Sequence, residues 1–150
     1  MLLTIERVAL LKSIDIFAET PDHMLASVAR IIHEVEVAQG ETFIREGEAA
    51  DCLFTVIEGQ VRVHSQDRTI IVLGPGKTVG ELALLDPEPR AASVTALEDT
   101  LLFRIDREPF DEVMADRPEI ARGVIRALTR RLREQGRIIT GMADSGGGRA

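Results

Sequence analysis

Apolar and polar positions along the chain change their spacing twice, which divides the sequence into three zones. Residues 3–33 carry apolar positions at helical spacing, including the stripe from Met24 to Ile32, and this spacing predicts helices. Thr20 followed by Pro21 is typical of a helix start, because a capping hydroxyl precedes proline at the first helical position. We therefore expect N-terminal helices over about residues 3–33.

Short segments of alternating or continuous apolar residues fill the second zone, residues 34–106. Glycine and proline separate these segments, most clearly at Gly59 and at Gly74-Pro75-Gly76. Short strands at this spacing predict a sandwich, a barrel or a jelly roll. The expected strands are 35–37, 43–44, 53–57, 61–64, 69–73, 92–96 and 101–105.

Helical spacing returns in the third zone, over about residues 107–140. Asp106 can cap one helix, and Pro118 can begin a longer one. Residues 141–150 include three consecutive glycines and are expected to form a disordered tail. The long helix carries an apolar seam with one polar member, Gln135; the seam comprises Ala121, Val124, Ile125, Leu128, Leu132, Gln135 and Ile139.

Composition narrows the class of protein. The 150 residues suffice for one domain, residues 1–140, and contain no apolar run long enough to span a membrane. A net charge of −7 argues against broad binding to nucleic acid or to an anionic membrane. Cys52 is the only cysteine, so no internal disulfide can form, and a reducing cytoplasm is the expected location.

Catalytic and metal-binding patterns are missing from the sequence. His23, His33 and His64 match no metal-ligand spacing, and no nucleophile is paired with a base. The expected protein is therefore not an enzyme and needs no cofactor. Residues 122–137 contain six arginines, which indicate either an anion-binding helix or, as charge runs usually do, a solvated helix face.

The segment from Gly80 to Val94 carries the most specific chemistry. Gly80 opens a short apolar turn, where free backbone N–H groups can bind an anion. Glu81 can accept hydrogen bonds from hydroxyls, and the guanidinium of Arg90 suits a bidentate phosphate contact. These residues together suit a ligand with a sugar diol and a phosphate. The alternative is that Glu81 and Arg90 only form a salt bridge with each other on the surface of an ordinary loop.

This segment resembles the phosphate-binding cassette of the cyclic nucleotide-binding domain family. The family pattern is Phe-Gly-Glu-Leu-Ala-Leu, a short loop, then Pro-Arg-Ala/Thr-Ala-Thr/Ser-Val. Residues 80–84 and 89–94 match it, with Val79 in place of the usual Phe. The resemblance covers about residues 14–137 and extends to the cAMP-binding domains of kinase regulatory subunits and of the catabolite activator protein. It implies an antiparallel β-roll (a double-stranded jelly roll) with N-terminal helices and a C-terminal lid helix.

The resemblance also implies a role for each matching residue. Glu81 would accept a hydrogen bond from the ribose 2′-hydroxyl, and Arg90 would pair with the cyclic phosphate. Gly80 would allow the ribose to approach the backbone closely. The remaining cassette residues implied to contact the ligand are Leu82, Ala83, Ala91 and Ala92.

Contacts to the base are less well defined by the resemblance. Val63, Ile70 and Leu73 would pack on the base, but each would serve equally well as a core residue. Arg131 would stack on the base. Gln135 would contact the adenine amino group or mark the point where the seam reaches solvent.

The expected function is that of a non-catalytic sensor whose C-terminal helices close on the ligand. Ala91 lacks the hydroxyl that favours cGMP in the family, so cAMP is the expected ligand and cGMP the alternative. Expected partners are an effector protein or fused domain, and a second copy bound through the C-terminal helix. Only about ten residues follow the long helix in this sequence, so a DNA-binding domain is not expected here. The alternative is a structural or protein-interaction module that keeps the fold without binding nucleotide.

Overall fold

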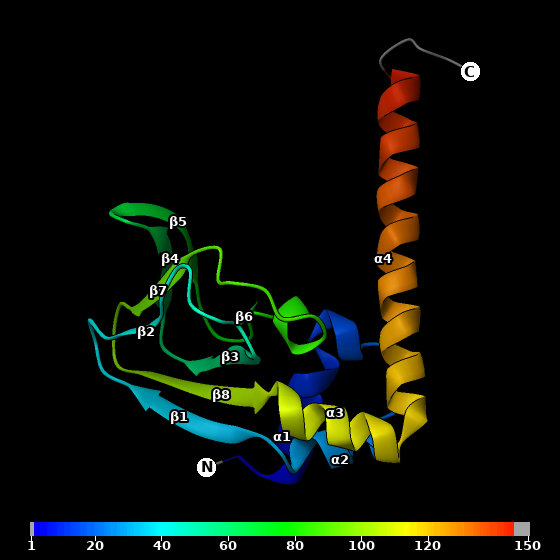
Figure 1. Cartoon of the computed structure of the whole chain (residues 1–150), viewed down its shortest axis with the longest axis horizontal. Helices are drawn as coiled ribbons and strands as arrows, with labels where there is room; N and C mark the ends of the chain where they lie inside the picture. The colour runs from blue at the N-terminus through cyan, green and yellow to red at the C-terminus, as the bar shows by residue number, and fades with distance from the viewer. Residues whose placement is uncertain (1, 146–150) are drawn as a thin grey trace.

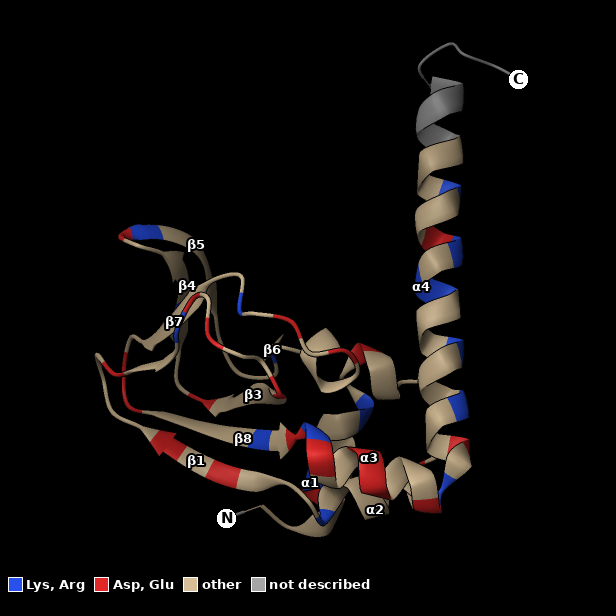
Figure 2. Cartoon of the chain, in the orientation of Figure 1, with Lys and Arg blue, Asp and Glu red and all other residues tan. Residues whose placement is uncertain are grey.

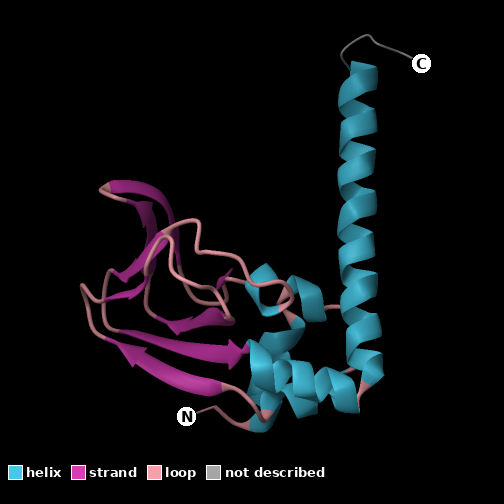
Figure 3. Ribbon diagram, viewed as in Figure 1, coloured by secondary structure: helices cyan, strands magenta, loops and turns pink. Residues whose placement is uncertain are grey.

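Antiparallel strands form the middle of the chain, and helices lie at one end of them (Figures 1 and 3). The structure is a computed structural model that describes residues 2–145, with side chains through Thr140. The strands are β1 (His33–Val37), β2 (Thr42–Ile44), β3 (Cys52–Glu58), β4 (Val61–Ser65), β5 (Arg68–Leu73), β6 (Thr78–Val79), β7 (Ser93–Ala96) and β8 (Thr100–Asp106). Two four-stranded sheets result, in the orders β1-β8-β3-β6 and β2-β7-β4-β5.

Helices precede and follow the strands, and one short turn of helix interrupts them. They are α1 (Thr4–Lys12), the 3₁₀ helix η1 (Asp15–Phe17), α2 (Asp22–Ala29), the 3₁₀ helix η2 (Leu82–Leu84), α3 (Arg107–Asp116) and α4 (Pro118–Ser145). The predicted fold class, mostly antiparallel β with flanking helices, is confirmed. None of the helices in the described part of the chain is long and apolar enough to cross a bilayer.

Strand β3 is buried on both faces from Cys52 to Val56, and its sequence there is apolar except for the buried Thr55. Leu53 faces a core shared with the helices, where Phe17 and Phe110 meet edge to face with ring centroids 5.6 Å apart. Phe54 and Val56 face a second core inside the roll. Strand β3 therefore packs against both the inside of the roll and the helices, and it connects the two cores.

Helix α4 packs closely against Thr20 at Gly123. A Cβ atom at this position would lie 3.2 Å from the Cα atom of Thr20, so the missing side chain permits the close approach. Thr20 is fully buried, and its hydroxyl has no hydrogen-bond partner among the described residues. The predicted capping role of Thr20 is wrong, because Pro21 occupies the N-cap of α2 and Thr20 packs under α4 instead.

Helix α4 stands apart from the sheets as a single long helix (Figure 1). It continues through Ser145, where the sequence predicted a disordered tail from residue 141. A glycine costs a helix only about 1 kcal/mol, so Gly141 does not end it. The rest of the predicted tail, residues 146–150, lies outside the described residues. Basic residues are concentrated along α4, whereas β1 carries acidic ones (Figure 2).

Candidate functional site

Arg90 is positioned by a loop that folds back onto the turn at Gly47. The Gly47 N–H donates to the carbonyl oxygen of Arg90 at 2.8 Å, and the Arg90 N–H donates to Glu48 at 2.8 Å. Ala49 and Pro89 form an isolated antiparallel bridge beside these bonds. Both backbone groups of Arg90, its N–H and its carbonyl, are thus fixed by hydrogen bonds. This limits the directions in which the Arg90 side chain can point.

Gly80 lies directly beneath the Arg90 guanidinium. Its φ angle of +79° falls in the left-handed region, which favours glycine. A Cβ atom here would overlap the guanidinium and would lie 2.7 Å from the carbonyl oxygen of Cys52. The Cys52 contact is to backbone, so the strand itself would have to move. The glycine is therefore required by its own φ angle and by the Cys52 carbonyl oxygen, and a larger residue would also displace the Arg90 guanidinium.

The Arg90 guanidinium is held by neutral groups. Its Nη2 donates to the carbonyl oxygen of Cys52 at 3.0 Å and to the Cys52 sulfur at 3.2 Å. Burial raises the pKa of the Cys52 thiol, and the nearby Arg90 charge opposes this only in part. The thiol stays protonated and is a weak acceptor. Among the residues whose side chains the structure describes, Arg90 has no salt-bridge partner.

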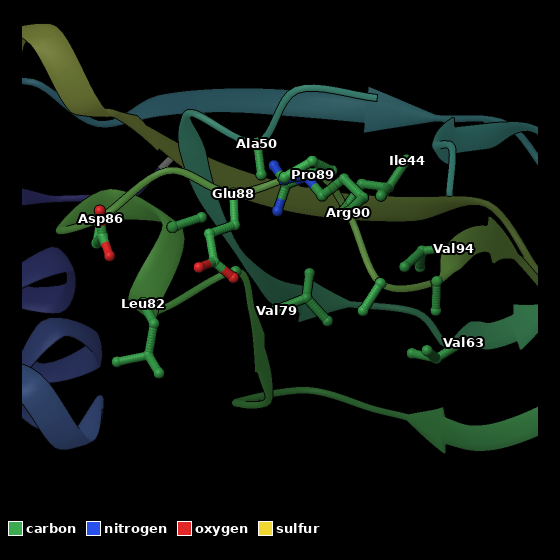
Figure 4. Close-up of a pocket in the computed structure, with 14 residues that line it drawn as sticks. Ile44, Ala50, Val63, Val79, Leu82, Asp86, Glu88, Pro89, Arg90 and Val94 are labelled. Carbon is green, nitrogen blue, oxygen red and sulfur yellow. The ribbon is translucent and has the colours of Figure 1, made fainter. Parts of the chain in front are cut away.

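A cavity of about 290 Å³ opens beside Arg90 (Figure 4). Seven residues predicted from the sequence line it: Val63, Gly80, Leu82, Ala83, Arg90, Ala91 and Ala92. Seven others line it that were not predicted: Ile44, Ala50, Val79, Asp86, Glu88, Pro89 and Val94. Most of these seven are sequence neighbours of the cassette residues, and this closeness in sequence is the signal that could have identified them. Ile44 and Ala50 come from segments far away in the sequence.

Some backbone N–H groups of the cassette already donate hydrogen bonds to other cassette residues. The Ala83 N–H donates to the carbonyl oxygen of Gly80 at 3.1 Å and closes the turn of η2. Leu82 is half exposed at the cavity wall, and Ala91 is exposed. The described residues include no group of three or more His, Cys, Asp or Glu side chains that could hold a metal ion.

Glu81 does not line the cavity. Its Oε1 accepts a hydrogen bond from Nη2 of Arg131 at 2.8 Å, and Arg131 also forms an ion pair with Asp15 of η1. Glu81 and Arg90 form no salt bridge with each other in the described part of the chain. The hydrogen bond to Asp15 is the largest cause of a raised Arg131 pKa. The structure thus places Arg131 against two carboxylates.

Three other predicted residues are not brought to the cavity. Ile70 is 58% exposed on β5, which is an edge strand of its sheet. Leu73 packs against the core inside the roll. Gln135 is exposed on α4, which packs on η1, α2 and α3. Helical periodicity identifies the seam that contains Gln135, but it does not determine the direction in which α4 leaves the sheets.

The roll has a largely apolar cavity with an arginine, unpaired among the described side chains, beside a glycine turn, which is the chemistry that a site for a small anionic molecule needs. Comparison with known families is more specific. The family model for the cyclic nucleotide-binding domain matches residues 34–117. The chain belongs to this family.

Individual relatives agree with the assignment. A CRP-like cAMP-activated global transcriptional regulator of Mycobacterium tuberculosis is 32% identical over 123 residues, 79% of this chain and 55% of that protein. The cyclic AMP receptor protein of Thermus thermophilus is 38% identical over 101 residues, 64% of this chain and 47% of that protein. The chain thus spans about half the length of these two curated relatives.

Solved structures show the same fold. The N-terminal domain of a transcriptional regulator from Streptomyces coelicolor A3(2) superimposes with a TM-score of 0.79 at 34% identity, covering 84% of this chain and 94% of that one. The regulatory domain of Toxoplasma gondii PKA, crystallised with cAMP, superimposes with a TM-score of 0.67 at 30% identity, covering 73% and 44% of the two chains. The fold is therefore that of known cyclic nucleotide-binding regulators.

Proposed function

We propose that the chain binds a cyclic nucleotide, with cAMP preferred over cGMP, and acts as a non-catalytic sensor in the cytoplasm. One observation carries the proposal: the Arg90 guanidinium lies at a cavity, and its described partners are a carbonyl and a thiol. A charge-assisted bond to a phosphate is stronger than bonds to such neutral acceptors. A cyclic phosphate can therefore displace Cys52 from Arg90 at a net gain.

The cavity supplies the other contacts that this ligand needs. Val63, Val79 and Val94 give it an apolar wall for the sugar and base. Glu81 lies one residue beyond Gly80 and can turn toward a ribose hydroxyl. Ala91 offers no hydroxyl to the amino group of guanine, which supports the preference for cAMP. The names of the relatives, two of which are described by their response to cAMP, support the same ligand.

Isothermal titration of the purified chain with cAMP and then cGMP tests the proposal, after any nucleotide carried through purification has been removed. Arg90→Ala should weaken binding by about 2–5 kcal/mol, since a desolvated charge pair loses one member. This corresponds to a loss of about 30-fold to about 4,000-fold in affinity. Arg68→Ala, on the exposed strand β5, is the matched control and should bind like the parent. Equal affinity of the Arg90→Ala variant and the parent would reject the site.

Helix α4 is proposed to respond to the ligand and to pair with a second copy of the chain. Three large exposed apolar side chains lie on one face of it at seven-residue spacing, Ile125, Leu132 and Ile139, and Ile138 is exposed beside that face. The side chain of Leu132 is 68% exposed. Exposing so much apolar surface to water costs free energy unless another surface covers it. Sedimentation of the parent and of Leu132→Gln should show a dimer for the first and a monomer for the second.

The same surface favours a second candidate function, a protein-interaction module that uses the fold without a nucleotide. In that case α4 would bind an effector protein or a fused domain of the same polypeptide. Absence of heat and of thermal stabilisation with both nucleotides, together with an intact dimer or partner complex, would favour this module over the sensor.

A further inference from the structure

Arg131 connects three elements that are distant in the sequence. It lies on α4, its Nε donates to Oδ2 of Asp15 on η1 at 2.9 Å, and its Nη2 bonds both Asp15 and Glu81. Glu81 immediately precedes η2 in the cassette. One guanidinium is therefore shared by two carboxylates, and one of these carboxylates is the proposed ribose acceptor.

We propose that Arg131 is a latch on the nucleotide site, and that Asp15 is the carboxylate that holds Arg131 when Glu81 turns to the ligand. The inference rests on the proposed function and adds its regulation. Glu81 is held by Arg131 outside the cavity that Arg90 lines. Glu81 does not line that cavity, so the side chain has to turn away from Arg131 before it can accept a hydrogen bond from a ribose hydroxyl there.

The exchange is possible at low cost because Arg131 has a second anchor. Its Nε and Nη2 both point at Asp15, so the bond to Glu81 can break while two donors remain satisfied. Glu81 and Arg131 are only about one-fifth and one-third exposed, so their hydrogen bond is partly shielded from water. Breaking it separates the cassette from α4 but leaves α4 attached to η1.

Opposite effects are expected from removing the latch and from removing its second anchor. Arg131→Gln frees Glu81 and should raise the affinity for the nucleotide about two- to fivefold, the range of a partly exposed ion pair. Asp15→Asn leaves Glu81 as the only carboxylate for Arg131 and should lower the affinity by a similar factor. In the double variant, the Asp15 change should have no further effect.

Matched controls exist for both variants. Arg133→Gln removes an exposed arginine two residues further along α4. Glu19→Gln removes a partner of Arg130 without touching Arg131. Both controls should bind cAMP like the parent. Arg131→Lys should fall between the parent and Arg131→Gln, because an ammonium lacks the planar fork that reaches two carboxylates.

Titration of cAMP into these variants at low salt and at about 1 M salt tests the latch. An ionic latch requires the ratio of Arg131→Gln affinity to parent affinity to exceed one at low salt and to become smaller at high salt, because salt screens a partly exposed ion pair in part. An unchanged or lower affinity of Arg131→Gln overturns the latch while leaving the proposed function in place, provided that the parent binds and Arg90→Ala does not. Absence of binding by the parent overturns the proposed function, and the latch with it.

Discussion

Replacing Gly80 by alanine separates two costs that the structure assigns to this position. The first is backbone strain, since a φ angle of +79° costs an L-residue about 1–2 kcal/mol. The second is steric, because the new Cβ would overlap the Arg90 guanidinium and approach the Cys52 carbonyl oxygen. Overpacking of this kind costs about 1–3 kcal/mol. The Gly80→Ala variant should therefore lose about 2–5 kcal/mol of unfolding free energy.

Gly76 provides the matched control. Its φ angle is +86°, and nothing lies within 4 Å of a Cβ atom built there. Gly76→Ala should lose only the strain, about 1–2 kcal/mol. Urea unfolding of both variants measures the difference, provided that their m-values agree. Gly80→Ala should also lose affinity for cAMP, because Arg90 is displaced, whereas Gly76→Ala should keep it. Equal destabilisation of the two variants would refute close packing beneath the arginine.

Three further substitutions test other parts of the structure. Gly123→Ala should destabilise the protein by about 1–3 kcal/mol through the close approach of α4, whereas Gly136→Ala, with open space around it, should stabilise the helix by up to about 1 kcal/mol in urea unfolding. Glu88→Gln removes a carboxylate from the cavity wall and should strengthen the binding of an anionic nucleotide about two- to fivefold at low salt. The pKa of Glu34 is lowered, chiefly by the Leu2 N–H. Its carboxylate therefore stabilises the fold at neutral pH and loses this effect as the pH falls below its ordinary pKa of 4.5. Glu34→Gln should accordingly destabilise the protein more at pH 7 than at about pH 3.

The cassette could be predicted from the sequence because its structure is largely local. Gly80 is required by its own φ angle, and η2 follows within four residues. Arg90 returns to the same place through a short proline-containing loop. Local spacing therefore brought six of the predicted residues to one cavity, and the seventh, Val63, reaches it from β4.

Contacts between distant segments could not be predicted in this way. The pairing of Glu81 with Arg131 joins residues 50 positions apart, and no periodicity encodes it. Strand β6 has only two residues, and it is a strand only because β3 lies beside it. Thr20 has the sequence of a helix cap, yet packing against Gly123 determines its place. For Glu81 and for β6, a tertiary contact determines what the local sequence leaves open. For Thr20, a tertiary contact overrides what the local sequence indicates.

The geometry of α4 makes it a lever. Its last ion pairs with other elements, among the described residues, are those of Arg130 and Arg131 with Asp15 and Glu81, and the helix continues to Ser145, a length of about 21 Å at about 1.5 Å per residue. A rotation of about 10° at these ion pairs would move the far end by about 4 Å, somewhat less than the rise of one helical turn. A small tilt at the ion pairs would thereby become a larger displacement at the helix end, where the proposed effector or second copy would meet it.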